Sequence, residues 1–394
     1  MKVLLFLGSG VSYPTKLPSV DEITQKLLYC DWQSVSNSIF RPGLGEQKSV
    51  DWPVERQQKF LRWLSAFADD YFRAPERKLP QRRVNYEDLY YLIHQIISDR
   101  CNGIHNPAIG KFILEAQSAT HDLCKDHLNE RFNLADLAEE SSRFIHFGVR
   151  HLLTTAKEPE GLGCVKHLAT DDSISKLDIV TLNHDLLLEK VLGEDCADGF
   201  DVVDGDGRFY NPAWFDVKKY RIRLLKLHGS INWRSLYRRS DEPRRCFIPL
   251  KASLLECCDS QGQRIAYDPE PVILIGSFNK LLDYRFGIFA DLHFRFFQLL
   301  RKRSTIVMSG YGWNDIGINS WLSEWFEWSA KNFLVLLDEK QRGEIKIRIN
   351  SSFQHRFDDL VESRRIILVP KWISKISANC LLKLLQKLRA RKAF

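Results

Sequence analysis

The chain has 394 residues, of which 44% are hydrophobic and 27% are charged, as in an ordinary globular protein of one or two domains. Its formal net charge of +7 is spread over both halves, so the composition does not support nucleic-acid binding. Because no apolar run is long enough to span a membrane, we expect no membrane contact and a cytoplasmic location.

The nine cysteines are scattered along the chain, and no two of them form a Cys-x-x-Cys pair. A disulfide framework and a tetrahedral zinc site both need closer pairing than this. We therefore expect reduced cysteines, no metal site and no zinc ribbon.

The first predicted element is a strand over residues 3–7, because this run is apolar throughout and is typical of a strand buried on both faces. It leads directly into a turn with two glycines and two serines. Glycines let the backbone approach a phosphate group closely, and the serine hydroxyls add hydrogen-bond donors. The candidate phosphate-binding residues are Gly8, Ser9, Gly10 and Ser12, although a Gly-x-Gly alone occurs by chance in many proteins.

A helix is predicted from about Asp21, with Ser19 as its N-cap and Glu22 completing a capping box. Residues 54–175 then show almost no strand pattern. Apolar residues at three- and four-residue spacing predict helices over 54–73, 86–100, 107–131 and 134–156.

We interpret residues 31–175 as a helical lobe inserted between two parts of one domain, 1–30 and 176–394. The polar residues 85–88 head one of its helices and either only cap that helix or help the lobe to roof a cleft.

Strands alternate with helices or turns again after Asp178, with strands predicted over 178–182, 222–227, 272–275, 304–309, 332–337 and 365–369. This alternation predicts an α/β fold with a doubly wound, Rossmann-like parallel sheet, in which residues 3–7 form the first strand. The stretches 194–220 and 236–270 are interpreted as long polar connections, which in compact domains are usually functional.

The stretch 178–189 has the pattern of strand, polar tip and helix. Its tip is Asn183, His184 and Asp185, and ligands of α/β proteins bind at such carboxyl ends of strands. The alternative is that an Asn or Asp there only caps the helix. Either interpretation is open from this stretch alone.

His228 follows the predicted strand 222–227 and precedes a glycine, so its ring can face the same edge of the sheet. An imidazole with an ordinary pKa near 6.5 is suited to accept a proton at cellular pH. The alternative is a structural histidine bonded to the backbone.

Two later strands also end in polar residues. Ser309 and Gly310 stand in a glycine turn after 304–309, and Asp315 begins the helix beyond it. Asp338 follows the strand 332–337, where a carboxylate can accept hydrogen bonds from a ribose. The alternative for Asp338 is a loop carboxylate in solvent.

In their order along the chain, the motifs GSGVS, LPS, TLNHD, KLHGSINW, SGYGWND and LLD resemble the sirtuin-like (silent-information-regulator-type) domain. The resemblance is to the divergent branch found in bacterial anti-phage defence proteins, and it covers most of the chain outside the helical lobe. It implies an NAD hydrolase that cleaves the nicotinamide–ribose bond of NAD, its substrate, without a metal.

The resemblance also implies roles for the candidate residues. Gly8, Ser9, Gly10 and Ser12 would surround the phosphates, Asn183 and Asp185 would lie by the nicotinamide ribose, and His228 would be the catalytic base. The remaining implied NAD-binding residues, on the later motifs and mostly toward the adenosine half, are Ser230, Ser309, Gly310, Asp315 and Asp338.

The chain departs from sirtuin deacylases in three features. It lacks their zinc-binding cysteines, it has Ser19-Val20-Asp21 in place of Asp-Phe-Arg, and it has Leu182 in place of the Gln before the Asn. These departures weaken the alternative of an NAD-dependent protein deacylase. A second alternative is a non-catalytic nucleotide-sensing subunit of a defence complex.

Because an unregulated NAD hydrolase would poison its own cell, the resemblance implies a gated effector that depletes NAD during anti-phage defence. It further implies that gating resides in a homo-oligomer or in a partner defence subunit such as a DNA-translocase-type ATPase. The candidate docking surfaces are the helical lobe and the predicted helix 373–391, with leucines at 381, 382, 384 and 385. The alternative is that both only close the domain's own core.

Overall fold

The computed structural model describes most of the chain. The described residues are 1–32, 54–73, 83–101, 105–125, 132–154, 158–200, 202–217, 219–236, 246–250, 257–276, 279–349 and 353–392.

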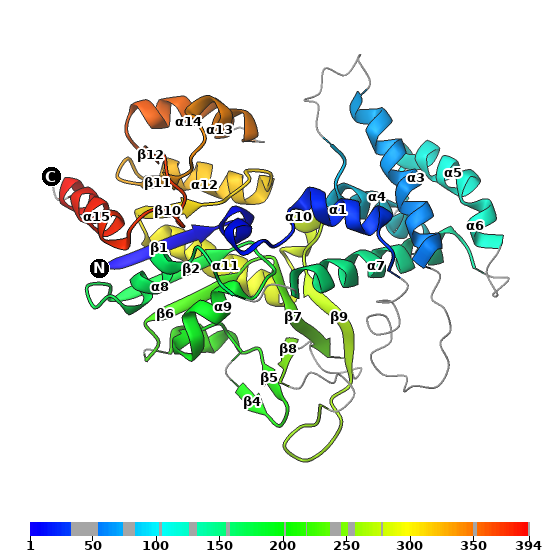
Figure 1. The fold of residues 1–394 in the computed structure, drawn as a ribbon, viewed down its shortest axis with the longest axis horizontal. Helices are drawn as coiled ribbons and strands as arrows, with labels where there is room; N and C mark the ends of the chain where they lie inside the picture. The colour runs from blue at the N-terminus through cyan, green and yellow to red at the C-terminus, as the bar shows by residue number, and fades with distance from the viewer. Residues whose placement is uncertain are drawn as a thin grey trace.

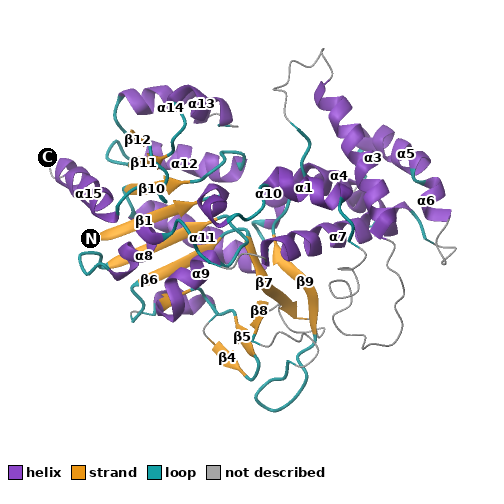
Figure 2. Ribbon diagram, in the orientation of Figure 1, coloured by secondary structure: helices purple, strands orange, loops and turns teal. Residues whose placement is uncertain are grey.

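The centre of the fold is a sheet of seven strands in the order β12-β11-β10-β1-β2-β6-β3, and every neighbouring pair is parallel (Figures 1 and 2). Its strands are β1 (Lys2–Leu7), β2 (Lys176–Thr181), β3 (Cys196–Ala197), β6 (Ile222–Lys226), β10 (Thr305–Ser309), β11 (Phe333–Leu337) and β12 (Ile366–Val369). The α/β fold with a doubly wound, Rossmann-like parallel sheet is thereby confirmed.

Helices cover both faces of this sheet, as the uninterrupted apolar strands require. On β1, Leu4 and Phe6 belong to one hydrophobic cluster while Leu5 and Leu7 belong to the other. The first cluster packs against α11 (Gly287–Lys302), α12 (Ile316–Trp328), α13 (Arg342–Arg348) and α14 (Phe353–Glu362). The second packs against α8 (Gly163–Thr170), α9 (Leu187–Leu192) and α15 (Ala378–Lys392).

A second, antiparallel sheet has five strands in the order β4-β5-β8-β7-β9. They are β4 (Val202–Asp204), β5 (Gly207–Phe209), β7 (Gly229–Leu236), β8 (Cys246–Pro249) and β9 (Tyr267–Ile273). Gly229, with a φ of +79°, turns the chain out of the parallel sheet directly after β6.

Two predictions are wrong in this region. Residues 272–275, predicted as a parallel strand, instead include the end of β9, where Ile273 pairs antiparallel with Gly229. The stretches 194–220 and 236–270, interpreted as polar connections, contain β3, β4, β5, β8 and most of β9. These strands are short or contain Pro and charged residues, so they lack a clear apolar pattern.

The helical lobe is confirmed as a bundle, with α3 (Val54–Arg73), α4 (Tyr86–Arg100), α5 (Gly110–Ala119), α6 (His121–Lys125) and α7 (Leu134–Thr154). Of the predicted helix 107–131, residues 126–131 lie outside the described residues, as do 155 and 156 of the predicted helix 134–156. Helix α1 (Val20–Tyr29) begins with the predicted capping box of Ser19 and Glu22.

The lobe and the sheets share elements. Helix α1 contributes Ile23 and Leu27 to the lobe's hydrophobic cluster, and Ile273 at the end of β9 belongs to the same cluster. Figure 1 shows α1 and α10 (Asn279–Asp283) between the parallel sheet and the rest of the lobe. The lobe is therefore packed directly against the region beyond the carboxyl ends of the strands.

Helix α15 lies on the parallel sheet and not apart from it. Its residues Leu381, Leu382 and Leu385 are buried in the hydrophobic cluster of α8 and β2. These leucines thus close the domain's own core, which is the alternative to a docking surface. Among the described helices, none is both long and apolar enough to cross a membrane.

Candidate functional site

The turns after β1 and β10 pack backbone against backbone. Gly8 N donates to Ser309 O at 3.0 Å, and Gly10 N donates to Gly310 O at 2.9 Å. A Cβ atom added at Gly8 would lie 2.5 Å from Gly310 O, and Gly310 itself has a φ of +69°. These glycines are thus needed for the close approach of two strand ends, whatever else the turn binds.

The turn after β1 also contacts the turn after β2 through side chains. Ser12 Oγ donates to Asp185 Oδ2 at 2.8 Å, and Asn183 Nδ2 donates to Ser12 Oγ at 2.9 Å. All three side chains are buried. Asp185 Oδ1 also accepts from Leu187 N at 3.1 Å at the start of α9. One carboxylate therefore bonds both to the first turn of α9 and to Ser12.

Two polar atoms in this turn have no hydrogen-bond partner among the described residues: Asn183 Oδ1 and His184 Nδ1. Both residues are more than nine-tenths buried. An unsatisfied buried acceptor costs about 1–3 kcal/mol, so such atoms usually have a ligand or a water as partner. A bound hydroxyl or amide would supply that partner here.

His228, just beyond β6, lies in a second cluster with Asp315 and Tyr284. Its Nε2 is 3.0 Å from Asp315 Oδ2 and 3.1 Å from the Tyr284 hydroxyl, which itself donates to the same carboxylate at 2.5 Å. The ring of His293 stacks on Tyr284 at a centroid distance of 3.7 Å. Asp315 Oδ1 accepts from Ile318 N at 2.9 Å, which fixes the carboxylate at the N-terminus of α12.

This arrangement sets the tautomer of His228. Because Asp315 accepts a hydrogen bond from Nε2–H, the other ring nitrogen, Nδ1, is left as the basic one. Nδ1 has no partner among the residues that the structure describes. Asp315 thus acts on the imidazole, whereas the resemblance implied an NAD-binding role.

Burial lowers the pKa of His228, and the nearby ammonium of Lys280 lowers it further, against the opposing effect of Asp315. Burial alone would raise the pKa of Asp315, but His228, Lys280 and Tyr284 hold it well below its usual range. His228 is therefore neutral and Asp315 ionised at neutral pH, the states that a general base and its orienting carboxylate need.

The two clusters are neighbours. The rings of His184 and His228 lie 6.3 Å apart between centroids, and Ile231 N donates to His184 O at 3.0 Å. Since β2 pairs in parallel with both β1 and β6, the turns that bear Ser12, Asn183 and His228 meet at one edge of the sheet.

Other predicted site residues are engaged within the protein. Ser230 Oγ accepts from Lys226 Nζ at 2.7 Å, and Ser309 Oγ donates to Leu337 O at 3.2 Å. Asp338 accepts from Arg348 at 2.6 Å and is 5% exposed. These three contacts explain the burial of the side chains without a ligand. Ser9 is exposed at the glycine turn.

Sequence reasoning missed Tyr284 and Lys280. Both lie in or beside the five-residue helix α10, which has too few residues to show a helical periodicity. Lys280 is 7% exposed and pairs with Glu87 of α4 at 3.1 Å. The lobe thus contributes the carboxylate of a charge pair beside the histidine cluster, in keeping with the interpretation of the lobe as a roof.

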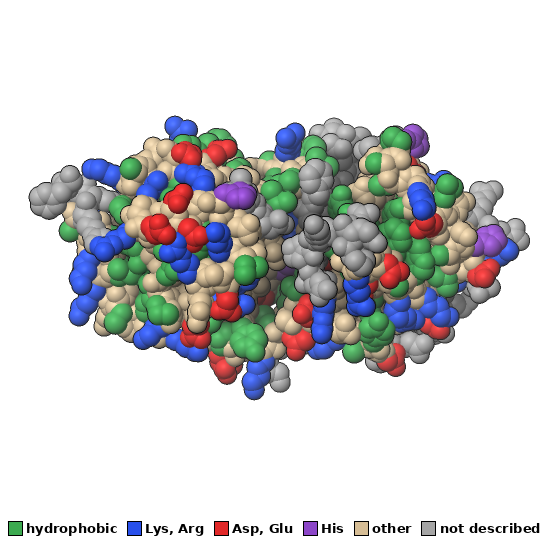
Figure 3. Space-filling view, turned by 90° about the horizontal axis from the view of Figure 1, so that it is seen from above, with side chains coloured by type: hydrophobic (Ala, Val, Ile, Leu, Met, Phe, Trp, Pro, Cys, Tyr) green, Lys and Arg blue, Asp and Glu red, His purple; other side chains and the backbone are tan. Residues whose placement is uncertain are grey.

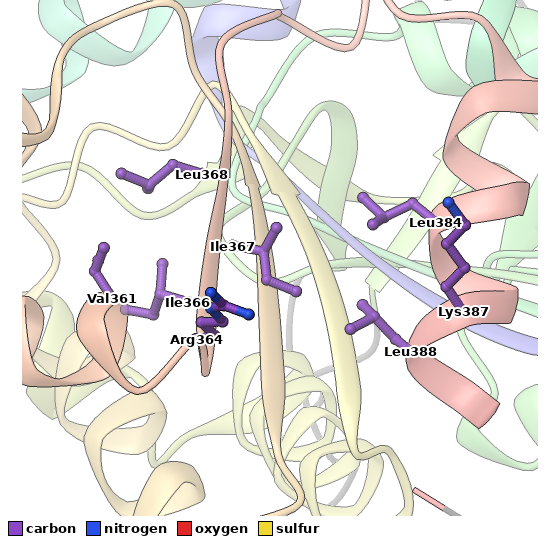
Figure 4. A pocket seen from close by; sticks show the side chains of 8 residues that line it. All are labelled: Val361, Arg364, Ile366, Ile367, Leu368, Leu384, Lys387 and Leu388. Atoms are coloured by element: carbon purple, nitrogen blue, oxygen red, sulfur yellow. The ribbon is translucent and has the colours of Figure 1, made fainter. Parts of the chain in front are cut away.

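A separate apolar groove lies between β12 and α15 (Figure 4). It has a volume of about 370 Å³, and leucine and isoleucine side chains dominate its lining, which includes none of the predicted site residues. On the face seen in Figure 3, basic and acidic side chains are interspersed over both halves of the molecule.

Comparison with models of known protein families found no match, and a search of curated proteins found none either. Within the described part of the chain, no group of three His, Cys, Asp or Glu side chains could hold a metal ion.

Proposed function

We propose that the protein is an NAD hydrolase that cleaves the nicotinamide–ribose bond to give nicotinamide and ADP-ribose. The observation that carries the proposal is the buried, neutral His228, oriented by Asp315, near an Asn183 whose side-chain oxygen lacks a partner among the described residues. A base and an open hydrogen-bond acceptor in one buried site are what the reaction requires.

Cleavage breaks the bond between ribose C1′ and the pyridinium nitrogen, and the electron pair leaves with nicotinamide. The positive charge that develops on the ribose would be stabilised by the carboxylate of Asp185, which Ser12 holds in place. Asn183 Oδ1 would accept a hydrogen bond from a ribose hydroxyl or from the attacking water. His228 Nδ1 would take the proton of that water as its oxygen bonds to C1′.

The test compares nicotinamide release by the parental chain with that by H228Q and N183A. We expect each substitution to lower the rate roughly 100- to 10,000-fold, since a positioned general base contributes about that much. The matched control is H355Q, because His355 is exposed on α14. Equal and measurable rates of NAD loss in all four proteins would disprove the residue assignment.

The same assay separates the alternatives. A protein deacylase would convert an acyl-lysine peptide and NAD into O-acyl-ADP-ribose, whereas a sensing subunit would bind NAD and return it intact. Adding the peptide to the reaction and recovering the nucleotide by chromatography distinguishes these outcomes from free ADP-ribose.

We also propose that the enzyme is a gated effector of anti-phage defence, held inactive until it assembles as a homo-oligomer or with a partner subunit such as a DNA-translocase-type ATPase. Size-exclusion chromatography combined with NAD consumption, with and without the product of the neighbouring gene, tests this. Constant activity of the monomer under all conditions would contradict gating.

A further inference from the structure

His184 lies in the polar turn after β2, and its side chain has no role in the mechanism described above. The residue is 9% exposed, and its Nδ1 is buried without a partner among the residues that the structure describes. Its ring centroid is 6.3 Å from that of His228. A buried polar atom beside a candidate base, unpartnered within the protein, is a position where a ligand can supply the missing hydrogen bond.

The backbone of His184 is held independently of its ring. Its carbonyl oxygen accepts from Ile231 N at 3.0 Å and from Ser230 Oγ at 3.3 Å, which ties the turn to the beginning of β7. A substitution of the ring removes neither of these bonds. The side chain can therefore be exchanged while the turn that carries it remains attached to β7.

The ring of His184 is neutral, because burial lowers its pKa well below the usual range. A neutral imidazole has one N–H and one lone pair. A hydrogen bond with the Gly229 backbone raises the pKa of His184, as a carbonyl oxygen that accepts from a ring N–H does. Since Nδ1 has no partner, this N–H is on Nε2, and Nδ1 carries the lone pair.

The polar surroundings of this lone pair are acceptors and not free cations. The other unpartnered atom of the turn, Asn183 Oδ1, is also an acceptor, and the carboxylate of Asp185 follows in the chain. The ammonium of Lys226 donates to three acceptors within the protein, and that of Lys280 is paired with Glu87 at 3.1 Å. The turn is thus suited to a group that brings hydrogens and no negative charge.

We propose that His184 is a specificity-determining residue, whose Nδ1 accepts a hydrogen bond from an uncharged N–H or O–H group of the substrate. Such a group satisfies the buried acceptor, whereas a carboxylate would set lone pairs against lone pairs beside the charge of Asp185. On NAD the available donors are the nicotinamide carboxamide and the ribose hydroxyls. The inference rests on the proposed function, since it takes NAD as the substrate.

The test compares the binding of four nucleotides to the full chain by calorimetry. They are NAD, its analogue with a carboxylate in place of the carboxamide, and two analogues that lack the 2′- or the 3′-hydroxyl of the nicotinamide ribose. H228Q serves as the background, so that the nucleotides stay intact. We expect one analogue to bind about 100-fold more weakly than NAD or worse, because it leaves a buried acceptor unpaired. The analogue that is rejected identifies the donor group.

H184F in the same background keeps an aromatic ring but has no acceptor. We expect its preference for NAD over the rejected analogue to fall to about 10-fold or less, because both nucleotides then lack the bond. H184N should restore most of the preference, since its amide oxygen can take the place of Nδ1. The matched control is H355F, because His355 is exposed on α14. A merely structural role of the ring would weaken all four nucleotides alike.

The outcomes separate this inference from the proposed function. Equal preference with and without the His184 ring overturns the inference, as does the absence of any preference among the four nucleotides when His184 is present. Neither result affects the assay of nicotinamide release. A preference that depends on His184, in a protein whose parental form releases no nicotinamide, supports the inference and contradicts NAD hydrolysis. Failure to bind all four nucleotides overturns both.

Discussion

The histidine of the candidate site depends on a single carboxylate. Asp315 is 3.0 Å from His228 Nε2 and raises the pKa of the imidazole, against the lowering by burial. It thus fixes the ring and the tautomer of His228. In the proposed mechanism, Asp315 is a positioning residue and His228 is the catalytic one.

D315N should lower kcat by roughly 100-fold or more, since an amide in this place can hold the wrong tautomer of His228. It should also move the acidic limb of the pH–rate profile to lower pH. Without the negative charge the imidazolium is less stable, so the pKa of His228 falls. The profile is measured on kcat between pH 4 and 8, with D358N as the control because Asp358 belongs to a surface network on α14.

Removal of the Ser12 side chain and removal of the Asn183 side chain should cost different amounts of folding stability. N183A deletes an oxygen that has no partner among the described residues, together with one hydrogen bond from Nδ2 to Ser12 Oγ, so stability should fall by roughly 1 kcal/mol. S12A leaves both Asn183 Nδ2 and Asp185 Oδ2 without a partner, and should cost about 1–3 kcal/mol. Urea unfolding measures both. Equal losses would mean that Asn183 has a structural role beyond the one proposed.

At the scale of elements, the glycine turns after β1 and β10 join the strands that carry the site. A Cβ at Gly310 would lie 2.6 Å from Val11 N, and its φ of +69° disfavours any side chain. G310A should therefore destabilise the fold by several kcal/mol, roughly 3 or more.

The control is G343A on α13, where a new Cβ meets nothing within 4 Å. Alanine in a helix should there stabilise by about 1 kcal/mol or less. Both variants are compared by urea unfolding. If G310A proved as stable as the parental chain, the close backbone approach of the two turns would be wrong.

Six of the seven parallel strands were predictable because each is a mostly apolar run that ends in a polar or glycine turn, whereas the two-residue strand β3 was missed. Once they are parallel neighbours, the meeting of Ser12, Asn183 and His228 follows from sheet geometry. The antiparallel strands were not predictable, since β9 carries two prolines and charged residues. The partner of His228 could not be found either, because Tyr284 lies in a segment without periodicity.

The burial of Ser230, Ser309 and Asp338 shows a different limit of sequence reasoning. Each stands at a strand end, where ligands of such folds bind, yet each hydrogen-bonds within the protein. A sequence motif places a side chain at an edge of the sheet but does not say whether it faces the cleft or the core.

For the whole molecule, buried neutral histidines couple stability to pH. Burial lowers the pKa of His94 to about 4 and of His293 to about 3, and it also lowers those of His184 and His228. The unfolded chain takes up protons below about pH 6.5 while the folded one does not, so stability falls as the pH falls.

We expect the free energy of unfolding to decrease from pH 7 to pH 4, by up to about 1.4 kcal/mol per pH unit for each such histidine. Urea unfolding at several pH values measures the slope, and H94Q should reduce it. A stability that rises as the pH falls through this range would contradict the neutral state of these rings.

Our central proposal is that the turns after β1, β2 and β6 form one site that adds water to the ribose of NAD. The most direct measurement is incubation of NAD with the purified chain in ¹⁸O-water, together with the neighbouring gene product, followed by mass spectrometry. The account predicts nicotinamide and ADP-ribose with a single ¹⁸O from the parental chain, and unchanged NAD from N183A and H228Q. Unchanged NAD from the parental chain, or equal labelling by all three proteins, would contradict it.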